Sequence, residues 1–263
     1  AIEQGLTDPF CGLNMGQTAE KLAREFGFSR EAQDEFANNS HRKAVLAMEG
    51  HKFDEEIVPI IAGKSLEEIV SKDNGPRPDS TMEKLAKLKP FFERGTGTVT
   101  VGNACPITDG GSVWLLCSEA AVKKYHLDPI AKMVDFHFHG LEPERMGLGP
   151  VLAMNGVFKR TGLGLKDMDL VEINEAFAAQ VMGCLEVMKN KKYAELTYKP
   201  NPYLTFTTSY DHYRLIKQYH WLESIYESKD EKFHNLFFVA EPFRPKSVFP
   251  FSNVALIIMI RVE

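Results

Sequence analysis

Apolar residues recur with helical spacing near the start of the chain. The pattern predicts a helix over residues 18–26, with Thr18 as its N-cap and Gly27 as the residue that ends it. The apolar positions of this helix follow the i, i+3, i+4, i+7 spacing: Ala19, Leu22, Ala23 and Phe26. Ser29 is the predicted N-cap of a second, longer helix that stops at Gly50.

Farther along, β-branched and apolar runs alternate with helical segments. The runs predicted as strands are Ile57–Ile61, Thr98–Val101, Val113–Cys117, Ile130–Phe138 and Leu170–Ile173. Glycines and prolines over residues 62–80 predict a loop, and a short helix follows through Met82, Leu85 and Leu88. Two further helices are predicted, from Pro150 to Gly162 and over Ala176–Met188. This alternation predicts an α/β architecture with a mostly parallel sheet.

The last part of the chain differs in composition. All 19 glycines precede Leu185, whereas seven of the eight tyrosines follow it. A long stretch without glycine cannot easily supply positive-φ turns, so we place a boundary at about residues 185–192. Beyond it, the pattern predicts a helix over Ser209–Ser228 and strands over Asn235–Ala240 and Asn253–Glu263. The aromatic residues of this tail indicate either a core or a binding surface.

Composition and charge narrow the class of protein. The 263 residues are 44% hydrophobic and 25% charged, which is typical of a soluble globular protein. The net charge of −5 argues against a general nucleic-acid binder. The four cysteines show no CxxC spacing, which predicts a reducing compartment and neither zinc nor disulfides. No apolar run is long enough to span a bilayer, so we expect a cytoplasmic protein. An Ala at position 1 suggests a processed or incomplete chain.

Asn174 is the first candidate for chemistry. It follows the predicted strand Leu170–Ile173 and precedes a predicted helix, at the sheet edge where α/β proteins bind ligands. The side chain either caps the helix or presents a fixed amide dipole to a water or a developing oxyanion. Position alone does not separate these alternatives.

Three other features carry weaker signals. The stretch Gly95–Gly111 is rich in glycine and would let a ligand lie against the backbone, but it lacks the GxGxxG order of a dinucleotide site. Met146–Pro150 is a similar loop before a helix. His137 and His139 alternate along a predicted strand and share one face, yet no third ligand accompanies them, so we expect no metal site.

The order of the segments resembles the thiolase family. Seven collinear stretches carry the resemblance: Asn14–Glu20, Ser29–Ala37 with Ser40 and His41, Glu55–Pro59, Leu85–Pro90, Gly97–Gly111, Met146–Pro150 and Asn174–Ala178. They cover about residues 5–185. The lead Leu6–Pro9 and the stretch Leu13–Met15 look more like the fatty-acid-oxidation branch than the small acetoacetyl enzymes.

The resemblance implies an incomplete thiolase-like fold, with βαβ layers and an inserted, mainly helical loop domain, plus an unassigned α+β tail. Residues 1–95 would form the loop domain and 96–127 the end of the N-terminal half. Residues 128–188 would begin the C-terminal half, and 189–263 would be the tail. The resemblance also implies a Claisen condensation or its thiolytic reverse on acyl-coenzyme A, with no cofactor beyond that substrate, and a homo-oligomer, either a dimer or a tetramer.

The family's functional residues transfer to seven positions. Asn174 matches the asparagine that, with a histidine, stabilises thioester oxyanions, so the resemblance favours the oxyanion role over the cap. The positions matching residues that bind the substrate or coenzyme A are Met15, Arg77, Phe92, Cys105, Met146 and Phe177. Met15 and Met146 would line the acyl pocket, Phe177 would border the active site, Phe92 would pack near the pantetheine arm and Arg77 would hold a phosphate. Cys105 stands where the family usually has a serine. Ordinary packing or a solvated charge would also explain these residue types.

The sequence also departs from the family. In the family, the nucleophilic cysteine precedes the segment that Leu6–Glu20 resembles, so its segment is absent from this sequence. The tail contains neither the family's HPxGxSGAR histidine loop nor its CxGGG loop. Cys11, Cys117 and Cys184 match no catalytic motif. We therefore expect a thiolase-type acyltransferase fragment that is inactive as this chain. The alternatives are a non-catalytic module that binds coenzyme A or a partner, and a truncated gene product. We also expect exposed sheet edges that favour association.

Overall fold

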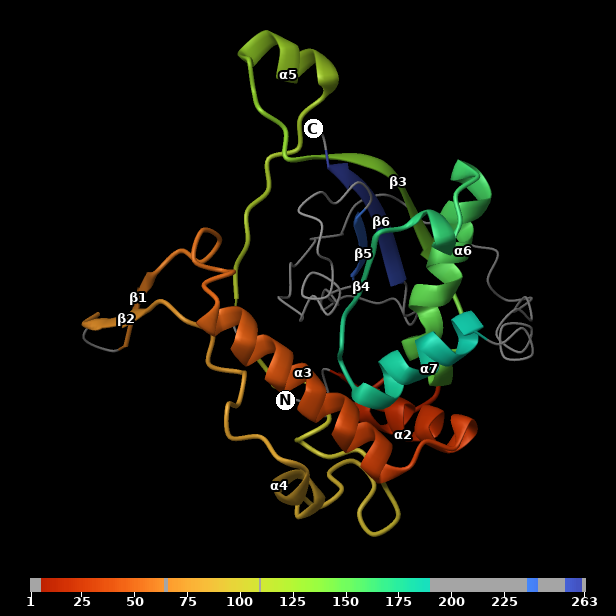
Figure 1. Ribbon diagram of the computed structural model, residues 1–263. Helices are drawn as coiled ribbons and strands as arrows, with labels where there is room; N and C mark the ends of the chain where they lie inside the picture. The colour runs from red at the N-terminus through yellow and green to blue at the C-terminus, as the bar shows by residue number, and fades with distance from the viewer. Residues whose placement is uncertain (1–5, 64–65, 109, 190–235, 241–253, 262–263) are drawn as a thin grey trace.

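The computed structural model describes residues 6–63, 66–108, 110–189, 236–240 and 254–261. Two helices open the fold, α2 (Met15–Phe26) and α3 (Arg30–Glu49). The elements that follow are β1 (Ile60–Ala62), β2 (Glu68–Val70), α4 (Met82–Ala86), α5 (Glu119–Tyr125), β3 (Ala131–His139), the 3₁₀ helix η1 (Pro143–Leu148), α6 (Gly149–Thr161), the 3₁₀ helix η2 (Leu165–Asp167), β4 (Leu170–Ile173), α7 (Ala178–Lys189), β5 (Leu236–Ala240) and β6 (Val254–Arg261). Figure 1 shows α2, α3 and α7 gathered at one end and the sheet with α6 beside them.

Helix α2 begins earlier than the apolar spacing predicts. Asn14 is its N-cap: the Asn14 side chain accepts from the Gln17 backbone N–H at 2.9 Å, and the Gln17 side chain accepts from the Asn14 backbone N–H at 2.9 Å. This reciprocal capping box satisfies two backbone donors at the helix start. The predicted cap at Thr18 is wrong, because Thr18 lies inside the helix and its hydroxyl donates to the Met15 carbonyl. The end at Gly27, which has φ of +71°, is confirmed.

Helix α3 is confirmed with its predicted ends at Ser29 and Gly50. The strand predicted over residues 57–61 is shorter and begins at Ile60, and β1 pairs antiparallel with β2. Strand β2 lies inside the stretch 62–80 that was predicted as a loop, so that prediction is wrong at residues 68–70. The short helix after this stretch is confirmed as α4.

Two predicted strands are absent from the described residues. Residues 98–100 pair with no strand and residue 101 lies in a turn; side chains bind the amides of this stretch, since Glu20 accepts from the Thr98 and Val99 amides and Asn103 accepts from the Thr100 amide. Residues 113–117 also form no strand, and Val113 is 98% exposed. The β-branched residues suggested strands at both places. Val99 is instead buried outside any strand, and Val113 is exposed and contributes to no strand.

The main sheet has four strands in the order β3-β6-β5-β4. Strand β4 runs parallel to β5, whereas β6 is antiparallel to both β5 and β3. The predicted mostly parallel sheet is therefore wrong, since two of its three pairings are antiparallel. The strands predicted at 130–138, 170–173, 235–240 and 253–263 are confirmed within one or two residues. The helix predicted over Ser209–Ser228 lies outside the described residues.

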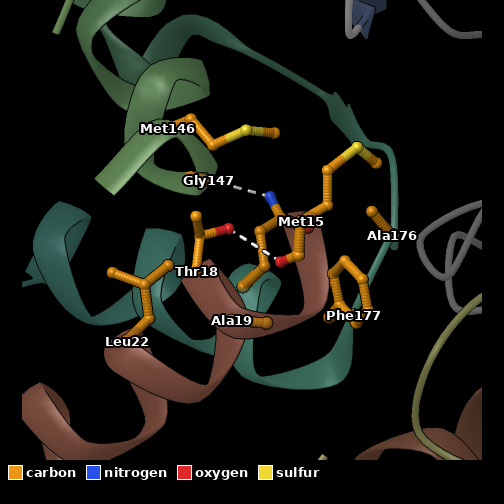
Figure 2. Close-up of a pocket in the computed structure, with 9 residues that line it drawn as sticks. Met15, Thr18, Ala19, Leu22, Met146, Gly147, Ala176 and Phe177 are labelled. Carbon is orange, nitrogen blue, oxygen red and sulfur yellow. Dashed lines mark hydrogen bonds between the residues drawn. The ribbon is translucent and has the colours of Figure 1, made fainter. Parts of the chain in front are cut away.

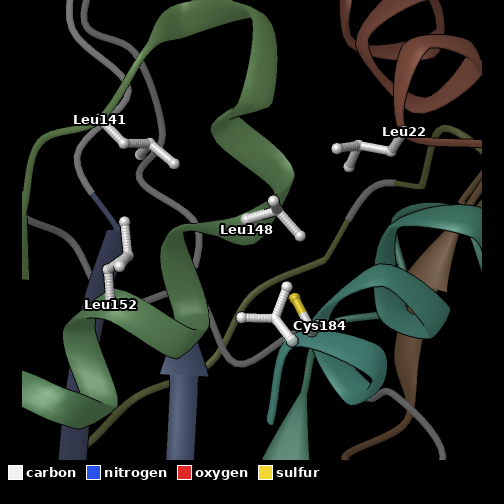
Figure 3. Packing of buried hydrophobic residues seen from close by; sticks show 6 residues of the cluster. Leu22, Leu141, Leu148, Leu152 and Cys184 are labelled. Carbon is white, nitrogen blue, oxygen red and sulfur yellow. The ribbon is translucent and has the colours of Figure 1, made fainter. Parts of the chain in front are cut away.

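A buried apolar cluster joins the helices beside the sheet. Helix α6, which starts with Pro150 in its first turn and stops at Gly162 as predicted, packs against β3 and β6. The cluster consists of Leu22, Leu141, Leu148, Leu152, Cys184 and Val187, drawn from α2, η1, α6, α7 and the turn after β3 (Figure 3). It packs the second half of α2, at Leu22, against the second half of α7, at Cys184 and Val187. Among the described residues, no helix is both long and apolar enough to cross a membrane.

Candidate functional site

A small pocket lies where α2, η1 and the start of α7 meet (Figure 2). Its empty volume is about 220 Å³, part of which opens to solvent. The lining residues are mostly apolar: Met15, Thr18, Ala19, Leu22, Met146, Gly147, Ala176, Phe177 and Gln180. Three residues predicted from the resemblance, Met15, Met146 and Phe177, therefore share one pocket although they are far apart in the sequence.

An aromatic pair borders the pocket. Phe92 and Phe177 meet edge to face with ring centroids 5.7 Å apart. They pack with Met15 and Cys105 around a buried cluster that includes Val99 and Ala176. Gly16 permits this approach, because a Cβ atom there would lie 2.1 Å from the Phe92 ring. The predicted site residues Phe92 and Cys105 are thus brought beside the pocket.

The loop at residues 103–105 is bonded to the chain that carries Phe177. The Cys105 amide donates to the Ala176 carbonyl at 2.9 Å, and the Ala178 amide donates to the Asn103 carbonyl at 3.0 Å. The Asn103 side chain is in turn fixed, since its Nδ2 donates to Asp34 Oδ1 at 2.9 Å from α3. The pocket wall is therefore held by contacts that join three distant segments.

Asn174 lies in the connection between β4 and α7. Helix α7 begins at Ala178, and the Phe177 carbonyl accepts its first amides, from Gln180 and Val181. Asn174 is too far ahead of that helix to cap it, so the capping alternative is wrong. The Asn174 Oδ1 atom is buried and has no hydrogen-bond partner among the described residues. An amide in that condition is available to a water or a ligand.

Helix α3 connects Asn174's neighbour with the loop that carries Arg77. Ser40 Oγ donates to Glu175 Oε2 at 2.7 Å, and the next residue, His41, accepts at Nδ1 from the Arg77 amide at 3.3 Å. Burial lowers the pKa of His41, the Arg77 charge lowers it further and Asp79 partly offsets both. A neutral His41 ring suits its role as an acceptor. Arg77 itself is exposed and does not line the pocket.

The Ser40 to Glu175 contact makes the first prediction. Replacing Ser40 with Ala should lower the free energy of unfolding by about 1.5–3 kcal/mol, because a hydrogen bond to a charged acceptor is lost. Urea denaturation followed by circular dichroism measures the change. The matched control is Ser71→Ala, because Ser71 is exposed and its replacement should change the free energy of unfolding by less than about 0.5 kcal/mol. Ser29→Ala is unsuitable as a control because Ser29 caps α3. Equal stability of both variants would contradict the prediction.

Sequence reasoning missed several members of the pocket. Thr18, Gly147 and Gln180 line it, and Gln180 falls one helical turn after Phe177. That i, i+3 spacing was visible in the sequence, but it identifies a shared face only once the start of α7 is known.

His137 and His139 contact each other and an arginine side chain, an arrangement that differs from that of metal ligands. Their rings are 5.9 Å apart, and the Arg160 guanidinium binds His137 Nδ1 at 2.7 Å and Asp135 Oδ2 at 2.8 Å. Burial lowers the pKa of both histidines, and nearby cationic side chains lower it further. Within the described ranges, no three His, Cys, Asp or Glu side chains cluster as metal ligands.

Comparison with protein families gives two matches. Residues 1–120 match the model for the thiolase N-terminal domain, and residues 127–198 match the model for the thiolase C-terminal domain. A probable acetyl-CoA acyltransferase of Staphylococcus aureus (strain COL) is 45% identical over 181 residues, which are 68% of this chain and 46% of the relative. The chain thus spans about half the length of the curated relatives it matches.

Solved structures extend the likeness to nearly the whole chain. The Bacillus anthracis acetyl-CoA acetyltransferase matches with a TM-score of 0.76 and 32% identity, over 98% of this chain and 63% of that one. The human mitochondrial 3-ketoacyl-CoA thiolase matches with a TM-score of 0.74 and 28% identity, over 99% of this chain and 63% of that one. The same human enzyme in complex with CoA matches with a TM-score of 0.70 and 27% identity, over 99% and 62%.

Proposed function

The chain belongs to the thiolase family, and from that premise we propose that it is part of an acyl-coenzyme A C-acyltransferase that makes or cleaves 3-ketoacyl-coenzyme A in fatty-acid oxidation. The single observation that carries this proposal is the convergence of Met15, Met146 and Phe177 on one pocket. The same pocket is lined by Ala176, which follows Asn174 by two residues in the chain. An acyl thioester needs such an arrangement, because its tail is apolar and its reacting carbonyl is polar.

In this proposal Asn174 polarises the thioester. Its amide N–H groups donate to the carbonyl oxygen as negative charge develops there, and the residue follows directly on the end of β4 at Ile173. The buried Oδ1 atom, which has no hydrogen-bond partner in the part of the chain that the structure describes, can accept from a water placed next to the same oxygen. Neither role requires a metal or a cofactor.

The coenzyme A part of the substrate would extend away from the pocket. Phe92 and Cys105 border the pocket and would contact the pantetheine arm, and the exposed Arg77 would bind a phosphate. Helix α3 contacts both the segment next to Asn174 and the loop that carries Arg77. Ser40 binds Glu175, and His41 binds the Arg77 backbone. We propose a cytoplasmic homo-oligomer, as the family resemblance implies.

Coenzyme A binding makes the second prediction. Arg77→Ala should raise the dissociation constant of coenzyme A about tenfold, because a charge-assisted bond to phosphate is lost from an exposed position. Isothermal titration calorimetry of the full chain measures it. Arg24→Ala is the matched control, since Arg24 is an exposed arginine whose side chain pairs with Glu93. Equal weakening by both substitutions would contradict a specific role for Arg77.

A second candidate function is a module that binds a protein partner. The observation in its favour is the apolar run over residues 113–116, where Val113 is 98%, Leu115 80% and Leu116 73% exposed. Exposed apolar runs of this kind mark contact surfaces. Calorimetry separates the candidates, because the absence of heat at millimolar coenzyme A would leave only the partner-binding role.

A further inference from the structure

The chain before β3 forms an arm, residues 110–130, that exposes most of its large apolar side chains. All four side chains of residues 113–116 are exposed, and Tyr125, Leu127 and Ile130 add to the same arm. Helix α5 lies within the arm and has no buried residue, and Figure 1 shows it projecting away from the other helices and the sheet. Exposed apolar surface of this extent marks a site of contact with another macromolecule.

Residues 110–118 have the composition of a buried strand but not its surroundings. The run Val113–Cys117 is apolar throughout, and no residue from Gly110 to Ser118 is charged. Continuous apolar runs of this length are typical of strands that are covered on both faces. In the part of the chain that the structure describes, the run forms no strand, and every residue from 113 to 117 is exposed. Burial of this run requires a partner that the described residues do not supply.

The run is complementary to a second copy of itself. In an antiparallel pair centred on Leu115, position 113 of one copy lies opposite position 117 of the other, and position 114 lies opposite position 116. Leu115 then meets its own counterpart, and each Trp114 meets Leu116 across the pair. Aromatic and aliphatic cross-strand pairs of this kind stabilise antiparallel strands. A two-fold interface needs such a surface, because the same patch serves both copies.

Charge and size favour the same pairing. Pairing over residues 112–118 stops where α5 begins, and none of these residues is charged, so two copies approach without like-charge repulsion. The hairpin of β1 and β2 also exposes apolar side chains, but it carries Glu68 within β2. Stable interfaces use about 20–30 residues on each side, a number that the arm of residues 110–130 supplies.

We propose that the arm is a homodimer interface, in which residues 112–118 of two copies form an antiparallel ribbon centred on Leu115. A two-stranded ribbon alone is only marginally stable, so the exposed Tyr125 and Leu127 are buried in the same interface. The inference deepens one part of the proposed function, the homo-oligomer, by naming its contact surface, and it rests on that part alone. Neither Asn174 nor coenzyme A enters it.

Disulfide cross-linking of the full chain tests the centre of the ribbon. Leu115→Cys in a Cys117→Ser background places one thiol from each copy at the two-fold axis. The two Cα atoms would lie about 4.5–5.5 Å apart, within the range that a disulfide spans. After oxidation with copper phenanthroline, non-reducing electrophoresis should show about tenfold more covalent dimer than the Cys117→Ser parent. The parent is the blank because it keeps Cys11, Cys105 and Cys184.

A second set of chains tests the register. Val113→Cys with the native Cys117 should cross-link as well, because positions 113 and 117 face each other in the proposed ribbon. Val113→Cys with Cys117→Ser should stay at the parent's level, since its two introduced thiols would lie about 14 Å apart along the ribbon. The wild-type chain should also stay at that level, because each Cys117 faces Val113.

Sedimentation velocity of the full chain measures the association without cysteine chemistry. The wild type should sediment as a dimer at about 10 μM. Leu115→Lys should raise the dimer dissociation constant about hundredfold, because two ammonium groups would face each other across the ribbon. The matched control is Val58→Lys, since Val58 is 78% exposed, compared with 80% for Leu115, and lies outside any strand. It should leave the dissociation constant within about threefold of the wild-type value.

The outcomes separate this inference from the proposed function. A monomeric wild type overturns both the interface and the proposed homo-oligomer, and leaves a different polypeptide as the partner of the arm. A dimer that Leu115→Lys leaves intact, or Leu115→Cys cross-linking no stronger than the parent's, overturns the interface and leaves the homo-oligomer to another surface. Equal weakening by Val58→Lys overturns it too, because any added charge would then explain the effect. The titration of coenzyme A tests the nucleotide site independently of all these results.

Discussion

Acetoacetyl-coenzyme A mixed with coenzyme A and the purified chain should be cleaved no faster than in buffer without protein. The proposed chemistry needs a nucleophilic thiol and a histidine beside Asn174. By the family resemblance, the nucleophilic cysteine belongs to a segment upstream of the one that Leu6–Glu20 resembles, and these 263 residues contain neither the HPxGxSGAR histidine loop nor the CxGGG loop. Loss of a nucleophile or its base typically lowers the catalytic rate by about 10⁴-fold or more, because the groups act as a unit. The assay follows the loss of 3-ketoacyl thioester absorbance.

A complete thiolase measured in the same cuvette is the positive control. Turnover by the chain at a comparable rate would reject the prediction and would mean that one of its own thiols attacks the substrate. Cys105 would then be the first to replace, since it packs beside Phe177. Cys105→Ser would be the variant to compare, because serine is the usual residue at this position in the family.

Replacing Glu20 with Ala should lower the free energy of unfolding by about 2–6 kcal/mol. Glu20 is 1% exposed and accepts from the Thr98 amide at 2.8 Å and the Val99 amide at 2.9 Å. Each buried amide left without an acceptor costs about 1–3 kcal/mol. The loop that follows should also loosen, which hydrogen exchange at the Cys105 amide would detect as faster exchange.

Urea denaturation measures the stability change, with Glu35→Ala as the control. Glu35 is an exposed glutamate on α3, so its removal should change stability by less than about 0.5 kcal/mol. Glu20→Gln should fall between the two, because it keeps one acceptor oxygen but turns an amide N–H₂ group toward backbone donors. A Glu20→Ala protein as stable as the Glu35 variant would reject the anchoring role.

Much of the candidate site could be predicted from short motifs. Met15, Phe92, Cys105, Met146 and Phe177 were named from the sequence, and the structure brings all five to one pocket and its border. Their roles toward a substrate stay predictions. The resemblance could name them because short stretches such as Asn14–Glu20, Met146–Pro150 and Asn174–Ala178 match the family in order along the chain. Gln180 was missed because its place in the pocket lining depends on how Gly147 and Leu22 pack around it.

The strands show where such reasoning fails. Val99 has the composition of a strand residue, yet its amide is bound by a carboxylate from α2, which no pattern within residues 98–101 reveals. The sequence of β6 also does not indicate that this strand runs antiparallel to β3 and β5. Side chains alternate between the two faces of a strand whether its neighbours are parallel or antiparallel.

The sequence by itself determined α3 and α6 with their ends, the end of α2 at Gly27, the strands β3, β4, β5 and β6, the family and the residue types of the site. Those features depend on backbone preferences and side-chain periodicity within a dozen residues. Only the tertiary structure decided the start of α7, the mixed sheet and the pocket between α2, η1 and α7. Each of these depends on contacts between segments far apart in the chain, whose free energy exists only once the core has formed around Leu22 and Leu148.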